Sequence, residues 1–172
     1  CKVLLENGDL DHSCKRGFPT PSASFYYFTK MDKKHPDIKK YCEYTKNYID
    51  KDSVAEVDAV TGAFLIIPRS IYEKINGFDE AFFMYGEDLD LCYRVKELGF
   101  KVIYYGRVSI THLKGQSGLH KKSKVVIKYF YDAMSIFYDK HYRKKYNVFV
   151  TLAVKTAIKM KYLLTIIKSS GK

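Results

Sequence analysis

Acidic side chains gather where a loop is expected to enter a helix. The run Glu87-Asp88-Leu89-Asp90 places three carboxylates within four positions. Acids in a first helical turn are stabilised by free backbone N–H groups and the helix dipole, which is the ordinary explanation for such a run. Adjacent carboxylates also repel each other, and this raises a pKa towards the value that a general base needs. The run is therefore a candidate site for acid–base chemistry.

The residues before this acidic run favour the chemical explanation over the ordinary one. The segment Phe82-Phe83-Met84-Tyr85-Gly86 is apolar and aromatic, and it ends in glycine. This apolar segment predicts that the carboxylates lie in a pocket with apolar walls rather than at a solvated helix end.

The acidic run needs a helix to hold it, and the sequence predicts one from Glu87 to Leu98. Leu91, Val95 and Leu98 recur at helical spacing, and Gly99 provides the stop signal. A turn is expected at residues 6–9. Further elements are expected as a strand at 2–5, a buried strand at 57–68 broken at Gly62, a short helix at 69–75, a strand at 101–105 and a helix at 123–141. This alternation predicts an α/β domain.

Four motifs in a fixed order carry a family resemblance. They are Gly62-Ala63 through Arg69, the long run Gly77 through Arg94, Gly99 through Tyr104, and His112 with Gly115 and Ser117. This series resembles family 2 glycosyltransferases, specifically the rhamnosyltransferase-like branch that builds bacterial surface polysaccharides. A lone Glu-Asp pair would be a weak signal, whereas the ordered series is specific. The similarity extends to about residue 142.

The resemblance implies part of a GT-A fold, the nucleotide-diphospho-sugar transferase fold: an α/β architecture with a mixed sheet, flanking helices and a C-terminal helical extension. Residues 1–122 would form the acceptor-side, catalytic half, and residues 123–172 the C-terminal helices. The nucleotide-binding half, with its aspartate-rich metal motif, is expected outside this chain. Asp9-Leu10-Asp11 follows the turn at Asn7-Gly8 and is interpreted as turn chemistry. We therefore expect the isolated chain to be inactive.

The implied reaction is inverting sugar transfer from a nucleotide-diphosphate donor to an acceptor hydroxyl. The family's base falls on Asp88, with Glu87 orienting it or tuning its pKa. A divalent cation, Mn²⁺ or Mg²⁺, is implied, with His112 as a metal or diphosphate ligand and the remaining ligands in the other half. The alternative for His112 is a ring satisfied by a neighbouring carbonyl.

Four further residues are candidate substrate contacts. They are Gly62, Phe83, Tyr85 and Arg94, with the two aromatic rings lining the acceptor pocket. For Arg94 the spacing to Asp90 favours a salt bridge on the helix surface instead.

The amino-acid composition narrows the classes of partner that the chain is expected to bind. The chain holds 30 Lys+Arg against 19 Asp+Glu, a net charge of +11 that favours an anionic partner. Nucleic acid is not the expected partner, because the aromatic residues fall in apolar runs rather than among the basic ones. The four cysteines form no C-x-x-C pair, which favours reduced thiols and a cytoplasmic location.

The C-terminal segment from Asn147 to Lys168 is amphipathic at helical spacing. Lysines at its centre argue against a membrane-spanning helix. Two alternatives stay open: a helix lying on an anionic membrane surface, which would make the protein peripheral at the inner face of the cell membrane, or a helix packing on the other half of the enzyme.

Two functions of different class follow. The first is an enzyme that transfers a sugar such as rhamnose to a glycan or lipid-linked glycan acceptor. The second is a non-catalytic remnant that keeps the fold and binds glycan or membrane. A second copy of the chain is a further candidate partner, because half of a sheet exposes an edge.

Overall fold

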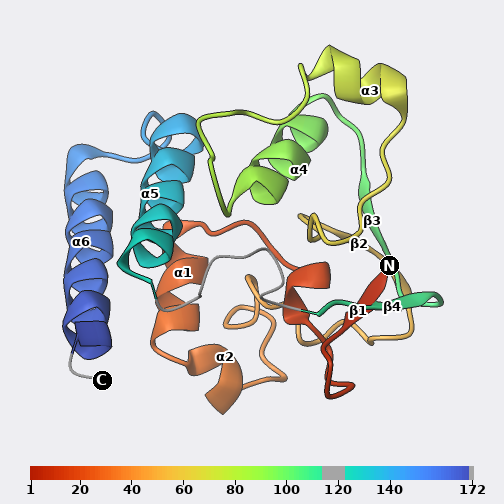
Figure 1. Cartoon of the computed structure of the whole chain (residues 1–172), viewed down its shortest axis with the longest axis horizontal. Helices are drawn as coiled ribbons and strands as arrows, with labels where there is room; N and C mark the ends of the chain where they lie inside the picture. The colour runs from red at the N-terminus through yellow and green to blue at the C-terminus, as the bar shows by residue number, and fades with distance from the viewer. Residues whose placement is uncertain (114–122, 171–172) are drawn as a thin grey trace. The chain divides into compact units, whose positions relative to one another are not determined.

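The computed structural model of the chain describes residues 1–113 and 123–170 (Figure 1). It divides into two compact units. Unit 1 comprises residues 1–79 with 88–114, and unit 2 comprises residues 80–87 with 115–172. The described chain combines helices with short strands, in agreement with the expected α/β class.

The strands of unit 1 are short. Strand β1 (Lys2–Leu4) pairs in parallel with β4 (Ser109–Thr111), and β2 (Val54–Val57) pairs antiparallel with β3 (Val102–Tyr105). Among the described residues these make two separate two-stranded sheets, so the expectation of one mixed sheet is wrong for this part of the chain. The strands predicted at 2–5 and 101–105 are confirmed.

The turn after β1 is also confirmed, and the aspartates near it make local hydrogen bonds. Gly8 has a positive φ of 82°, and the backbone N–H of Asp9 donates to the Asn7 side chain at 3.1 Å. Asp11 accepts from the Ser13 backbone N–H at 3.1 Å, which caps the short 3-10 helix η1 (His12–Cys14). Both aspartates therefore fit the turn chemistry expected of them.

The buried strand predicted at 57–68 is wrong. Strand β2 ends at Val57, and the chain then makes one antiparallel bridge, between Ala59 and Arg16. Residues 62–67 are turn and coil, and the side chain of Ile66 is 83% exposed. The physical reason lies at Gly62, whose backbone N–H donates to a side-chain carboxylate rather than to a strand.

Of the helices described in unit 1, the last two lie where helices are predicted from the sequence, whereas the first two were not predicted. In chain order, these helices are α1 (Pro21–Phe28), α2 (Met31–Lys34), α3 (Arg69–Lys74) and α4 (Glu87–Glu97). Helix α4 buries Leu91 and Val95 and is followed by Gly99 at a φ of 82°, a conformation that suits glycine after a helix end.

The segment 25–55, which had no sequence-based assignment, packs through aromatic rings. Tyr26 meets Tyr41 and Tyr27 meets Tyr44, with ring centroids 4.9 and 5.0 Å apart. The Cys42 side chain in this segment is fully buried, and all four cysteines of the chain are free thiols. The remaining core of unit 1 forms around Tyr104, Leu91 and Val3.

Unit 2 is built on two long helices. Helix α5 (Lys124–His141) begins at Ser123, whose side chain accepts from the Val126 backbone N–H, and α6 (Val148–Ser170) follows it. The two helices lie side by side and antiparallel (Figure 1). Both agree with the helices predicted from apolar spacing. Within the described residues, no helix combines the length and apolarity that crossing a membrane requires.

Candidate active site

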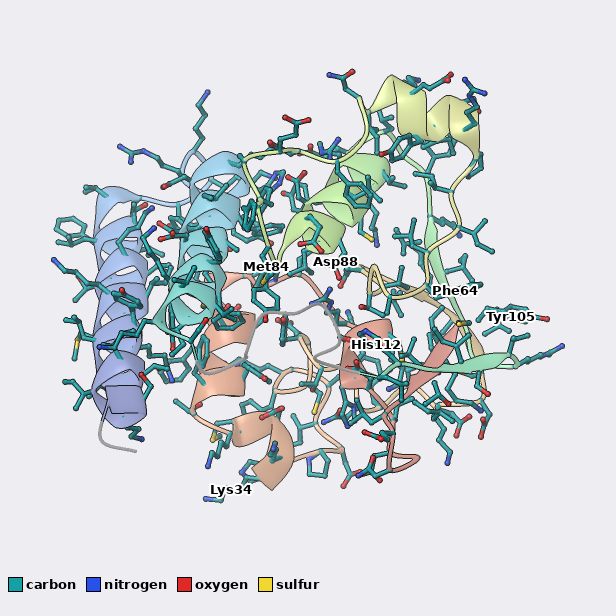
Figure 2. All side chains as sticks on the ribbon, viewed as in Figure 1. Lys34, Phe64, Met84, Asp88, Tyr105 and His112 are labelled. Atoms are coloured by element: carbon teal, nitrogen blue, oxygen red, sulfur yellow. The ribbon has the colours of Figure 1, made fainter. Side chains whose placement is uncertain are left out.

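The carboxylate of Asp88 lies in the first turn of α4 (Figure 2) and accepts three hydrogen bonds. Its Oδ2 accepts from Arg16 Nη2 at 2.5 Å and from the Gly62 backbone N–H at 3.0 Å. Its Oδ1 accepts from the Leu89 backbone N–H at 2.7 Å. Asp88 is only 8% exposed, so these partners replace most of its water. Among the described residues Oδ1 has that single donor, which leaves a lone pair for a further proton.

Arg16 is the site residue that the sequence interpretation missed. Its backbone is fixed by the bridge to Ala59, with N···O distances of 3.0 and 2.9 Å. Burial disfavours the guanidinium charge, but Asp88 and Tyr44 outweigh burial and raise the pKa of Arg16. No local pattern could have identified this arginine, because its partner lies 72 positions along the chain.

Gly62 belongs to the site through its backbone. The N–H of Gly62 points at the Asp88 carboxylate, so the structure does bring together two residues that were candidates for separate roles.

Arg94 is occupied by structural partners. Its Nε donates to Asp90 Oδ2 at 2.8 Å, and its Nη1 donates to the carbonyl of Ile75. The salt bridge to Asp90 is confirmed, but its placement on the helix surface is wrong, because Asp90 is fully buried. The pair with Asp90 lies within α4, and the hydrogen bond to Ile75 ties α4 to the end of α3.

Phe83 and Tyr85 lie in unit 2, before the acidic run. The ring of Phe83 meets Tyr129 at 4.7 Å, and that of Tyr85 meets Phe130 edge-on at 5.8 Å. Phe83 is nevertheless 70% exposed. Tyr85 and Gly86 both have positive φ, 67° and 81°. Backbone strain of this kind at a non-glycine residue is typical of functional sites. Glu87 is the first residue of α4.

His112 follows β4, where its backbone N–H donates to the carbonyl of Leu4 at 2.8 Å (Figure 2). Its ring Nδ1 is buried and has no hydrogen-bond partner within the described residues, so the expected neighbouring carbonyl is not found at this atom. The motif residues Gly115 and Ser117 lie outside the described residues.

A buried imidazole nitrogen without a partner fits a role as a metal ligand. Residues 1–113 and 123–170 hold no group of three His, Cys, Asp or Glu side chains that could bind a metal ion.

Cys92 lies one helical turn beyond Asp88 and carries no nucleophilic chemistry. Burial raises the pKa of its thiol to about 11, so the thiol is protonated at neutral pH.

Comparison with known protein families and curated proteins tests the resemblance carried by the motif series. The chain belongs to the family described as glycosyltransferase like family 2, whose family model matches residues 29–128. It is thus a glycosyltransferase-family chain with rhamnosyltransferase relatives.

Three curated relatives illustrate the similarity. Rhamnosyltransferase WbbL of Escherichia coli (strain K12) is 39% identical over 62 residues, 34% of this chain and 24% of that protein. N-acetylglucosaminyl-diphospho-decaprenol L-rhamnosyltransferase of Mycobacterium tuberculosis is 36% identical over 58 residues, 34% of this chain and 19% of that protein. O-antigen biosynthesis protein RfbC of Myxococcus xanthus is 25% identical over 117 residues, 68% of this chain and 8% of that protein.

The matched segments span 24% or less of the length of these relatives. No solved structure matches the chain.

Proposed function

We propose that this chain supplies the acceptor side of an inverting glycosyltransferase of GT-A fold. Residues 1–122 would form the catalytic part and residues 123–172 a helical extension. The donor would be a nucleotide-diphosphate sugar such as a rhamnose donor, and the acceptor a glycan or lipid-linked glycan of a cell-surface polysaccharide. The names of the relatives support the sugar and the acceptor class.

The observation that carries the proposal is the buried Asp88 carboxylate at the start of α4. In a single displacement, the acceptor hydroxyl oxygen attacks the anomeric carbon while its proton passes to the base, and the nucleoside diphosphate leaves. Oδ2 is held by Arg16 and the Gly62 N–H, whereas Oδ1 has one donor, so Oδ1 is the proposed proton acceptor. Phe83 and Tyr85 would offer apolar faces to the acceptor sugar.

A divalent cation, Mn²⁺ or Mg²⁺, would neutralise charge on the departing diphosphate when bound. The buried, unpartnered Nδ1 of His112 supports this residue as one of its ligands.

The test is sugar transfer by the complete natural protein that contains this chain, with and without Mn²⁺ or Mg²⁺. Asp88→Asn keeps the shape of the side chain but removes its basicity, so we expect transfer to fall by about 10²- to 10⁴-fold. Asp58→Asn is the matched control, because Asp58 is a half-buried carboxylate of unit 1 paired only with lysines among the described residues. Circular dichroism checks that both variants are folded.

A second candidate is the non-catalytic remnant, and one observation favours it. The Arg16 guanidinium pairs with the Asp88 carboxylate inside the fold, which is also the contact expected of a carboxylate with a purely structural role. Absence of transfer from the unmutated protein under all metal conditions would favour the remnant. Unchanged transfer in Asp88→Asn would place the base elsewhere.

A further inference from the structure

Helix α6 carries its large apolar side chains outwards. Val148, the first residue of the helix, is 71% exposed, and six more are between 48% and 79% exposed: Phe149, Leu152, Met160, Leu163, Leu164 and Ile167. At about 100° per residue these six fall on one face of the helix, with Thr156 as a polar residue among them. We call this face the apolar stripe.

The opposite side of α6 meets α5 and contributes polar groups to the contact. Lys155 donates to Ser135 Oγ at 2.6 Å and forms an ion pair with Asp139. The hydroxyls of Thr165 and Tyr131 lie 2.8 Å apart. No described side chain of α6 is buried. A surface helix normally turns its apolar face inwards, so packing on α5 does not account for the apolar stripe.

The charged residues in the part of the sequence that holds the apolar stripe are all basic. Residues 142–172 contain eight Lys and Arg and no Asp or Glu. Lys159 and Lys168 are exposed and lie along the two borders of the stripe. Lysine can lay its methylene stem against apolar material while its ammonium group reaches outwards to an anion. An apolar face bordered by cations complements a layer that is apolar inside and anionic at its surface.

We propose that the apolar stripe of α6 docks on an anionic lipid surface. The helix lies in the plane of the interface, its apolar side chains enter the acyl region, and Lys159 and Lys168 contact headgroup phosphates. This surface would bring the proposed transferase to a lipid-linked acceptor. The docking itself does not depend on that function, because it is measured without sugar transfer.

The test is co-sedimentation of the complete natural protein with vesicles of phosphatidylcholine alone or mixed equally with phosphatidylglycerol. We expect binding to the anionic vesicles that weakens with added salt. Replacing Leu152 and Leu163 together by Asp should lower the apparent partition coefficient by at least about tenfold, because both side chains would enter the acyl region.

The matched control replaces Phe64 and Ile66 together by Asp. These two apolar residues are also exposed, at 38% and 83%, and the change in charge is the same, but they lie in unit 1. This control should bind like the unmutated protein. The pair Lys159→Glu and Lys168→Glu should lose the preference for anionic vesicles.

Three results would overturn the proposal: no vesicle binding by the unmutated protein, equal loss in the Phe64 and Ile66 control, or a dimer without vesicle binding that the stripe variants dissociate. The last result would make the stripe a protein interface. Transfer to a water-soluble acceptor, measured on the same variants, keeps failure of docking distinct from failure of the proposed function.

Discussion

At the scale of single residues, the buried ion pair of Arg16 and Asp88 determines how the site responds to mutation. Their side chains are 14% and 11% exposed. Removing one partner of a buried pair leaves the other charge without water or counter-ion. We expect Arg16→Gln to lower the free energy of unfolding by about 3 kcal/mol, measured by urea denaturation.

Arg69→Gln is the control for this prediction. The pair of Arg69 with Glu73 is 90% and 60% exposed, so its loss should change the free energy of unfolding by less than about 1 kcal/mol. Equal losses in the two variants would show that the Arg16 pair is no more important to the fold than a surface pair.

At the scale of elements, two positions of unit 1 require glycine for different physical reasons. Gly99 has a φ of 82° and open space where a Cβ would lie, so Gly99→Ala should cost about 1 kcal/mol in backbone strain alone. At Gly17 a Cβ would lie 1.9 Å from the carbonyl oxygen of Glu43. Gly17→Ala should therefore cost about 3 kcal/mol or more, because backbone must move.

Thermal unfolding of both glycine variants measures this difference. A smaller loss for Gly17→Ala than for Gly99→Ala would mean that the loop carrying Glu43 yields easily, and would contradict the close approach seen in the structure.

Sequence patterns predicted those elements whose signals are local. Helix α4 was predicted by Leu91 and Val95 at helical spacing and a glycine stop, and the helix at 123–141 by the same kind of pattern. The apolar run 57–68 was predicted as a strand because hydrophobicity reports burial, whereas the backbone N–H of Gly62 donates to a side chain that is distant in sequence.

The residues of the candidate site also divide into those that a sequence motif predicts and those that depend on tertiary structure. Asp88 could be found from its motif, and its proximity to Gly62 is a fact of tertiary structure. Arg16 could not be found, because nothing near it in sequence indicates a distant carboxylate. The full burial of Asp90 was also missed, since an i to i+4 pair has the same pattern on a surface and in a core.

At the scale of the whole molecule, helices α4 and α6 differ in how many of their side chains are buried. Helix α4 buries seven of its residues, whereas no described side chain of α6 is buried. Local opening is easier where few side chains are buried. We therefore expect amides of α6 to exchange with deuterium faster than those of α4, measured by mass spectrometry of the complete natural protein.

Anionic vesicles should slow exchange in α6 and leave α4 unchanged if the apolar stripe docks on lipid. Equal protection of the two helices without vesicles would contradict the stability difference inferred from burial.

The long sequence separation of the Arg16–Asp88 pair has a consequence for synthesis of the protein. The two residues are 72 positions apart. At about 5–20 residues per second, a ribosome needs roughly 4 to 15 seconds to add the carboxylate after the arginine. During that interval the nascent chain carries the guanidinium of Arg16, which is buried in the folded protein, while its counter-ion Asp88 has not yet been synthesised. The first part of unit 1 therefore cannot close around its native interior until translation has passed the start of α4, and the candidate base is completed in the same event.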